Sequence, residues 1–369
     1  MRLPVDPLGT AVRNYLHLLD AESEACHSTR VLAQIRDCLQ RHRATEPPVR
    51  LSAIAEAFNI FPRPHFDASV RDGELVFSAK LGSFLIRLNE KFRGANLLAG
   101  KWPDEMAAAE LLGRGRFTYA HEFVHRFFYV HRDERWERAC ALAAQLEHDP
   151  NIRLRCLKAL QDLEESICDD VAGEVLVPAN LLVGVIGDSL VGGQTTAVPN
   201  VYELLRQISK YFNVSYDCAL VRVERAIRRN VVSCHQDLCI LFVEWSDRKG
   251  SSSASSSRRS RLDIRARVAV FPMAPGGLRV RRPFPGIAVE NFGAEVRQLV
   301  DSVLRDRRPN QRTGGLDLAV RLQAFRPRDR SIEHQGRLRG YWARLGHQRA
   351  DHPQDGRVLL WGVLEPALP

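Results

Sequence analysis

Apolar residues recur every three or four positions through residues 8–44, first at Val12 and Leu16 and later at Val31 and Ile35. This spacing places them on one face of a helix, so the segment predicts two N-terminal helices. Residues 73–89 instead contain two apolar strands around a turn at 80–83, which predicts a β-hairpin.

Helical spacing returns in the middle of the chain, where we expect one helix over 152–176 and two over 202–229. Ser215 is placed to cap the second helix of the pair, which has a helix-turn-helix pattern. We favour a pair of helices with a structural role over a helix-turn-helix that binds DNA. Shorter helices are expected over SAIAEAFNI, capped by Ser52, and over DEMAAAELL, and the run RFTYAHEFVHRFFYVH forms another after a break at GRGR.

Strand-like runs reappear in the last third of the chain as LCILFVEW, IRARVAVF and RVLLWGVL, with one amphipathic helix, AEVRQLVDSVL, among them. The run SSSASSS is expected to be a flexible loop or linker. The fold class is therefore α+β. Four parts are expected: N-terminal helices over 1–46, a mostly helical domain with a small β-sheet over 47–190, the helix-turn-helix-like segment over 195–230, and a C-terminal α+β domain over 231–369.

Charge is unevenly distributed over the 369 residues, whose formal net charge is +9. Residues 251–369 hold 22 arginines, no lysine and 11 acidic residues, so this segment carries +11. A basic domain can attract nucleic acid or an acidic partner. Solvated arginines on the surface of the domain are the simpler interpretation.

Nothing in the sequence indicates a secreted or membrane protein. Acidic and polar residues interrupt the N-terminal stretch where a signal peptide needs an apolar run, and no run of 18 apolar residues occurs. The eight cysteines include no CxxC pair, which favours free thiols of a reducing compartment. Cys234, His235 and Cys239 lack the second pair of a metal site. We expect a cytoplasmic protein.

The run RFTYAHEFVHRFFYVH contains the pattern His121-Glu122-x-x-His125. Residues four apart lie one turn above each other on a helix, so both imidazoles can bind one Zn²⁺ ion. Glu122 is rotated away from that line, in the position of a general base that acts on water. Two histidines at the edge of a core would produce the same pattern without a metal.

A third ligand is expected from the helix at 152–176. Glu165 and Asp169 are again four apart, so they share one face of that helix. Glu165 could complete a two-histidine, one-glutamate set with one position open, while Asp169 could accept the second ring N–H of a ligand histidine. Glu164, nearer the apolar stripe, is the alternative ligand.

His131 is another candidate for the third ligand, because it completes the sequence pattern HExxHxxFxxH. The metzincin pattern has glycine where this chain has Phe128, and that glycine lets the chain turn toward the metal. A helix that continues through Phe128 would point His131 away from His125. We therefore expect His131 to be a surface residue.

The segments RFTYAHEFVH and ESICDDVAGEVLVP resemble the two signature stretches of the ImmA/IrrE family of metallo-endopeptidases, over about 50–230. Asp169 stands at the family's Asn/Asp position. Cys168 stands where the family has alanine, and Val171 where it has phenylalanine.

The resemblance implies a zincin-like fold with one Zn²⁺ per chain, held by His121, His125 and Glu165, and Glu122 as the catalytic residue. It also implies a protein substrate, a helix-turn-helix repressor whose cleavage releases stress-response or mobile-element genes. IrrE-like members carry a GAF-like C-terminal sensor, and 231–369 has a suitable length for one.

For substrate binding, we expect the hairpin strand with Phe84, Ile86 and Leu88 to offer an edge to which an extended peptide adds. Tyr119 and Tyr129 are expected in the core. Two other functions stay open: a DNA-binding or regulatory protein with a structural or vestigial zinc site, and a metal-dependent hydrolase of a non-peptide substrate. No membrane partner is expected, and DNA is not favoured.

Overall fold

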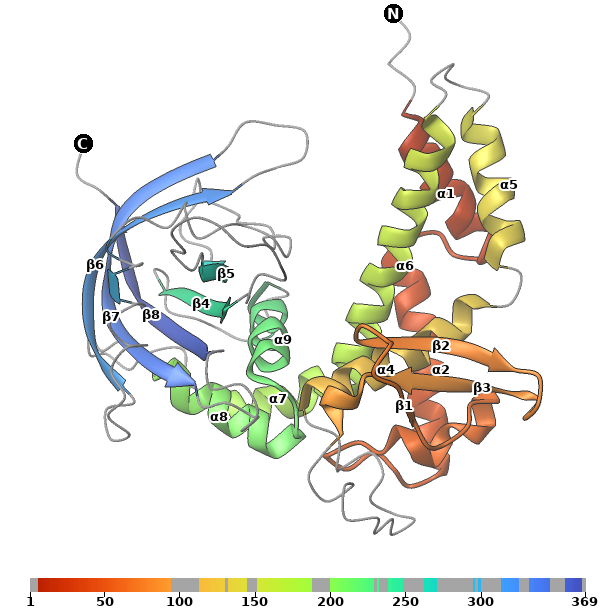
Figure 1. Cartoon of the computed structure of the whole chain (residues 1–369), viewed down its shortest axis with the longest axis horizontal. Helices are drawn as coiled ribbons and strands as arrows, with labels where there is room; N and C mark the ends of the chain where they lie inside the picture. The colour runs from red at the N-terminus through yellow and green to blue at the C-terminus, as the bar shows by residue number, and fades with distance from the viewer. Residues whose placement is uncertain are drawn as a thin grey trace, which may run out of the picture. The chain divides into compact units, whose positions relative to one another are not determined.

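Helices and β-sheets both contribute to the fold, so the chain is an α+β protein (Figure 1). Contacts divide it into two compact units, residues 1–182 with 206–222 and residues 183–205 with 223–369. The computed structural model describes residues 6–93, 113–129, 132–144, 151–187, 200–228, 231, 238–247, 262–270, 295, 298–299, 313–324, 332–345 and 356–366.

The two N-terminal helices are confirmed as α1 (Pro7–Leu18) and α2 (Glu24–Arg41). The Ser23 hydroxyl begins α2 by accepting a hydrogen bond from the backbone N–H of Cys26 at 3.1 Å. Both helices pack against α6 (Ile152–Leu176), as Figure 1 shows.

Helix α6 is the central element of the first unit and has the bounds that its apolar spacing predicts. Its buried positions include Cys156, Leu160, Ile167 and Val171, and these spacings of four and seven residues put them on one face. Helices α1, α2, α4 (Gly113–Tyr129) and α5 (Arg132–Ala144) all pack against it.

The start of α4 is held by close packing. A Cβ at Gly113 would lie 2.6 Å from the backbone of Val214 and Ser215, so only glycine fits there. Arg116 is almost fully buried and donates hydrogen bonds to the carbonyl of Val49 at 2.8 Å and to that of Phe212 at 3.4 Å. The expected break at GRGR is wrong, because these residues form the first turn of α4.

The predicted hairpin is confirmed as β2 (Gly73–Ser78) and β3 (Ser83–Leu88). The strand β1 (His65–Phe66) pairs in parallel with the other edge of β3, which gives the order β1-β3-β2. Strand β3 is therefore central, and β2 carries the edge that no described strand covers.

The expected helix at SAIAEAFNI is instead two short 3₁₀ turns, η1 (Leu51–Ile54) and η2 (Glu56–Phe58). Asn59 ends the second turn with a left-handed backbone, φ 57°. A third such turn, η3 (Glu90–Phe92), follows β3. The expected helix at DEMAAAELL lies outside the described residues.

The helical pair expected over 202–229 is confirmed as α8 (Val201–Phe212) and α9 (Tyr216–Arg228). The Ser215 hydroxyl caps α9 by accepting from the backbone N–H of Cys218. Helix α7 (Ala179–Ile186) precedes the pair.

One buried carboxylate joins three helices of the first unit. Glu174 of α6 forms ion pairs with Arg222 of α9 and, at 2.8 Å, with Arg36 of α2. Its carboxylate also accepts from the backbone N–H of Ala179 at 3.1 Å. The C-terminal end of α6 is thereby held on two sides.

The second unit contains a five-stranded antiparallel sheet in the order β5-β4-β8-β7-β6. Its strands are β4 (Leu238–Asp247), β5 (Leu262–Val270), β6 (Thr313–Ala324), β7 (Ile332–Leu345) and β8 (Gly356–Pro366). The last strand lies in the middle, with Val358 to Leu360 fully buried. The run SSSASSS, Cys234 and His235 lie outside the described residues.

Among the helices that the structure describes, none combines the length and apolar composition that crossing a bilayer requires.

His27 of α2 supplies a pH-dependent contact with α4. Its ring lies against Phe128, with the centroids 5.2 Å apart, and its side chain is almost fully buried. Burial, with the nearby charges of Arg30 and Arg135, lowers the pKa of His27 from 6.5 to about 4. The unfolded chain therefore takes up a proton below about pH 6.5 that the folded chain excludes until near pH 4.

We predict that the wild type loses about 2 kcal/mol more unfolding free energy than His27→Gln when the pH falls from 7 to 5. Glutamine keeps a polar side chain at the site but takes up no proton. Urea unfolding of both proteins at the two pH values measures the difference. An equal loss in the two proteins would show that His27 is not excluded from protonation in the fold.

Candidate metal centre

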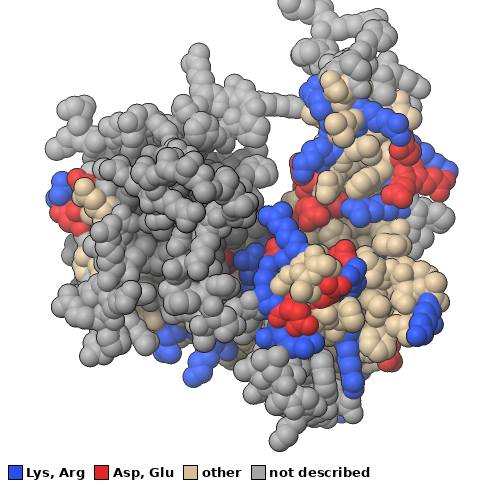
Figure 2. All heavy atoms as spheres, in the orientation of Figure 1, with Lys and Arg blue, Asp and Glu red and all other residues tan. Residues whose placement is uncertain are grey.

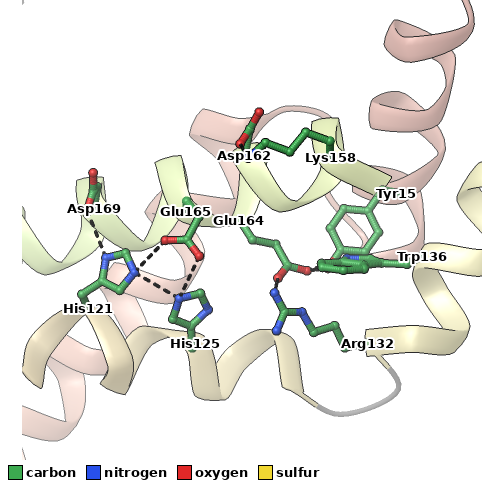
Figure 3. Close-up of polar contacts among 10 residues, drawn as sticks. All are labelled: Tyr15, His121, His125, Arg132, Trp136, Lys158, Asp162, Glu164, Glu165 and Asp169. Carbon is green, nitrogen blue, oxygen red and sulfur yellow. Dashed lines mark hydrogen bonds and ion pairs between the residues drawn. The ribbon is translucent and has the colours of Figure 1, made fainter. Parts of the chain in front are cut away.

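Two pairs of side chains face each other across the contact between α4 and α6 (Figure 3). His121 and His125 project from α4, and Glu165 and Asp169 project from α6. The Nε2 atoms of the two histidines lie 3.1 Å apart. Glu165 places one carboxylate oxygen 3.0 Å from His121 Nε2 and the other 3.6 Å from His125 Nε2.

These separations are those of ligands around one small cation. Bond lengths of about 2.0–2.2 Å put the donor atoms of a tetrahedral zinc ion about 3.3–3.6 Å apart. The three observed donor separations, 3.0, 3.1 and 3.6 Å, fall close to this range. The donor set of His121, His125 and Glu165 therefore fits a divalent metal ion.

Asp169 orients the His121 ring. Its carboxylate lies 3.0 Å from Nδ1, so Nδ1 donates to Asp169, and Nε2 is the nitrogen that faces His125 and Glu165. Carboxylates behind ligand histidines orient the ring and fix its tautomer in this way.

The two imidazoles experience opposite electrostatic effects. Burial would lower the pKa of His121, but the hydrogen bonds to Asp169 and Glu165 outweigh it and raise the pKa to about 10. Burial, followed by the neighbouring charge on His121, lowers the pKa of His125. Protonation of His121 therefore disfavours protonation of His125.

Glu122, the next residue of α4 after His121, contacts β2. A Cβ at Gly73 would lie 3.0 Å from its Cγ, and the backbone N–H of Leu75 donates to its carboxylate. Burial first, and then the charges of Glu165 and Glu74, raise the pKa of Glu122 to about 7. The carboxylate is thus held between the histidine pair and the uncovered edge of β2.

Cys168 was not predicted as a metal ligand from the sequence. Its sulfur and the ring nitrogens of His121 and His125 lie within 4.8 Å of one another, and this group could hold a metal ion. Cys168 is fully buried on α6, three residues after Glu165. The spacing of three was the available signal, but a cysteine on an apolar stripe has the pattern of a core residue.

Glu164, the alternative ligand, lies in a separate cluster, so that prediction is wrong. Its fully buried carboxylate accepts hydrogen bonds from Tyr15 of α1 and, at 2.8 Å, from Trp136 of α5. Arg132 forms an ion pair with it at 2.7 Å. Burial raises the pKa of Glu164, although Arg132 and both hydrogen bonds act in the opposite direction.

The predicted substrate-binding strand is also wrong. Phe84, Ile86 and Leu88 are buried, and β3 is paired along both edges, by β2 on one side and by β1 and a bridge from Ile60 on the other. The backbone groups of β3 at these positions are therefore already used and cannot receive a peptide.

The two tyrosines differ. Tyr119 is a core residue as expected, and its hydroxyl donates to the carbonyl of Pro62 at 3.3 Å. Tyr129 is 41% exposed, although its ring contacts Phe84. His131 lies outside the described residues, so its expected place on the surface stays a prediction.

No family model matches this chain, and no curated protein matches it. The interpretation of the site rests on the residues and their geometry.

We predict that Asp169→Ala weakens zinc binding about 10–100-fold, because His121 loses the carboxylate that fixes its tautomer. Competition against a chromogenic chelator measures the affinity. Asp162→Ala is the matched control, since Asp162 lies on the same helix in an exposed pair with Lys158. Equal zinc affinities of the two variants would contradict the role given to Asp169.

Proposed function

We propose that this chain is a zinc-dependent endopeptidase. The observation that carries the proposal is the convergence of His121, His125 and Glu165 within 3.0–3.6 Å, with Glu122 buried beside them. A bound zinc ion would activate the attacking water and polarise the scissile carbonyl. The two signature stretches resemble those of the ImmA/IrrE family. This resemblance, which implies a zincin-like fold, supports the same function.

In this mechanism Glu122 is the general base and then the general acid. Its carboxylate takes a proton from the attacking water and delivers it to the leaving amine. The Leu75 N–H and the absence of a side chain at Gly73 keep the carboxylate in one place. Asp169 would hold His121 in the tautomer that leaves Nε2 available to the ion.

The uncovered edge of β2 is the proposed place for the peptide. The Asn89 N–H donates to the carbonyl of Asp72, so Asp72 and every second residue after it direct their backbone N–H and C=O groups toward β3. Gly73, Leu75 and Phe77 consequently turn theirs outward. The Leu75 N–H is used by Glu122, so a peptide would pair with the groups of Gly73 and Phe77. An extended peptide that adds to this edge would run beside the general base.

The proposed substrate is a cytoplasmic protein, and the family resemblance suggests a helix-turn-helix repressor of stress-response or mobile-element genes. Free buried cysteines among the described residues are in keeping with a reducing compartment. A small repressor encoded beside this chain is the first substrate to test. By the same resemblance, we propose that residues 231–369 form a GAF-like sensor domain.

DNA binding by α8 and α9 is the second candidate, and we do not favour it. Leu204, Ile208 and Phe212 bury the apolar face of α8, as in a structural pair. On the face drawn in Figure 2, basic and acidic side chains alternate over the described residues of the first unit. A duplex is bound by a continuous basic stripe.

We predict that Glu122→Gln keeps one zinc per chain and lowers the cleavage rate at least about 100-fold, because an amide cannot accept the proton. Metal analysis and a time course on a repressor substrate measure the two quantities. Glu90→Gln is the control, since Glu90 lies on η3 in a pair with Arg93 and receives no catalytic role. Full cleavage by Glu122→Gln would contradict the mechanism.

We predict that Phe77→Pro raises KM several-fold more than Phe77→Ala, because proline removes the outward N–H of the strand edge, while alanine removes only the side chain. Steady-state kinetics on one peptide substrate compare the variants, and zinc content confirms that the metal centre is intact. Equal KM values would show that the peptide does not use this edge.

A further inference from the structure

Cys168 lies against the metal centre from the buried side. It follows Glu165 by three residues and precedes Asp169 by one, so all three occupy the part of α6 that faces α4. Its sulfur lies within 4.8 Å of the donor nitrogens of both histidines.

Glu165 and Cys168 approach the two histidines from different surroundings. The Glu165 side chain is 46% exposed, whereas Cys168 has no exposure. One donor of α6 is therefore on the solvent side of the imidazole pair and the other is on its buried side. With His121 and His125 they form a set of four donors, the number that fills a tetrahedral zinc site.

We propose that the Cys168 thiolate is a fourth protein ligand of the same ion and closes its coordination shell. The inference rests on the metal centre of the proposed function and deepens it. A centre with four protein donors is closed to water, and one with three is open. Cys168 thereby gives this centre a closed state, which opens when the sulfur leaves the ion.

Binding of the metal by Cys168 exchanges a proton for the ion. The S–H bond of Cys168 is replaced by a sulfur–metal bond, and the proton is released to solvent as the metal binds. A thiolate with two imidazoles selects zinc or cobalt over magnesium or calcium, which prefer oxygen. Glu165 contributes the only oxygen donor of the set.

Cobalt substitution tests the inference, because a thiolate bound to Co²⁺ gives a sulfur-to-metal charge-transfer band in the near ultraviolet and nitrogen or oxygen ligands give none. The metal-free full chain is titrated with Co²⁺, and absorbance is recorded for the wild type, Cys168→Ala and Cys168→Ser. Cys156→Ala is the matched control, since Cys156 is a fully buried cysteine of the same helix. Circular dichroism confirms that each variant is folded.

The expected result is a charge-transfer band in the wild type and Cys156→Ala, and its loss in both Cys168 variants. Those two variants still bind cobalt through His121, His125 and Glu165, but at least about tenfold more weakly, since loss of even an outer partner of a ligand costs about 10–100-fold.

Bound cobalt without this band in the wild type would overturn the role of Cys168 and leave the endopeptidase proposal standing. A wild type that binds no cobalt or zinc at all would overturn both. A band that persists in a folded Cys168 variant would show that another cysteine supplies the sulfur, and would also overturn the inference.

Discussion

The packing of α4 on α6 is the constraint on which the candidate site depends. Each helix carries two polar groups four residues apart, and neither pair alone makes a metal site. At the contact they meet with donor separations of 3.0–3.6 Å. Glu164 and Glu165 show how α6 is oriented, because consecutive residues of a helix point about 100° apart. Glu164 is anchored to Tyr15, Trp136 and Arg132, and this turns Glu165 toward α4.

The two helices are fixed at places away from the chemistry. Gly113 and Arg116 hold the start of α4, and the ion pairs of Glu174 with Arg36 and Arg222 hold the far end of α6. Ligands carried by rigid elements keep their geometry before a metal arrives. The same rigidity gives Glu122 a defined position against β2, so a substrate strand and the general base would be presented side by side.

Helical spacing made much of this site predictable. The pairing of His121 with His125 follows from a local period, and the structure brings Glu165 and Asp169 to them as expected. Glu164 stayed open as an alternative to Glu165 in part because the partners that hold it, Tyr15 and Trp136, come from α1 and α5. The edge of β3 was mispredicted because β1 has only two residues and gives no sequence signal. Cys168 was overlooked because a buried thiol has the same pattern in a core and in a metal site.

The proposed mechanism depends on one zinc ion between α4 and α6. An anomalous difference map from crystals of the full chain, recorded at the zinc absorption edge, shows directly where zinc binds. We expect one peak per chain within about 2.0–2.2 Å of His121 Nε2, His125 Nε2 and a Glu165 oxygen. A peak at other residues, or zinc-loaded crystals with no peak between these helices, would contradict it.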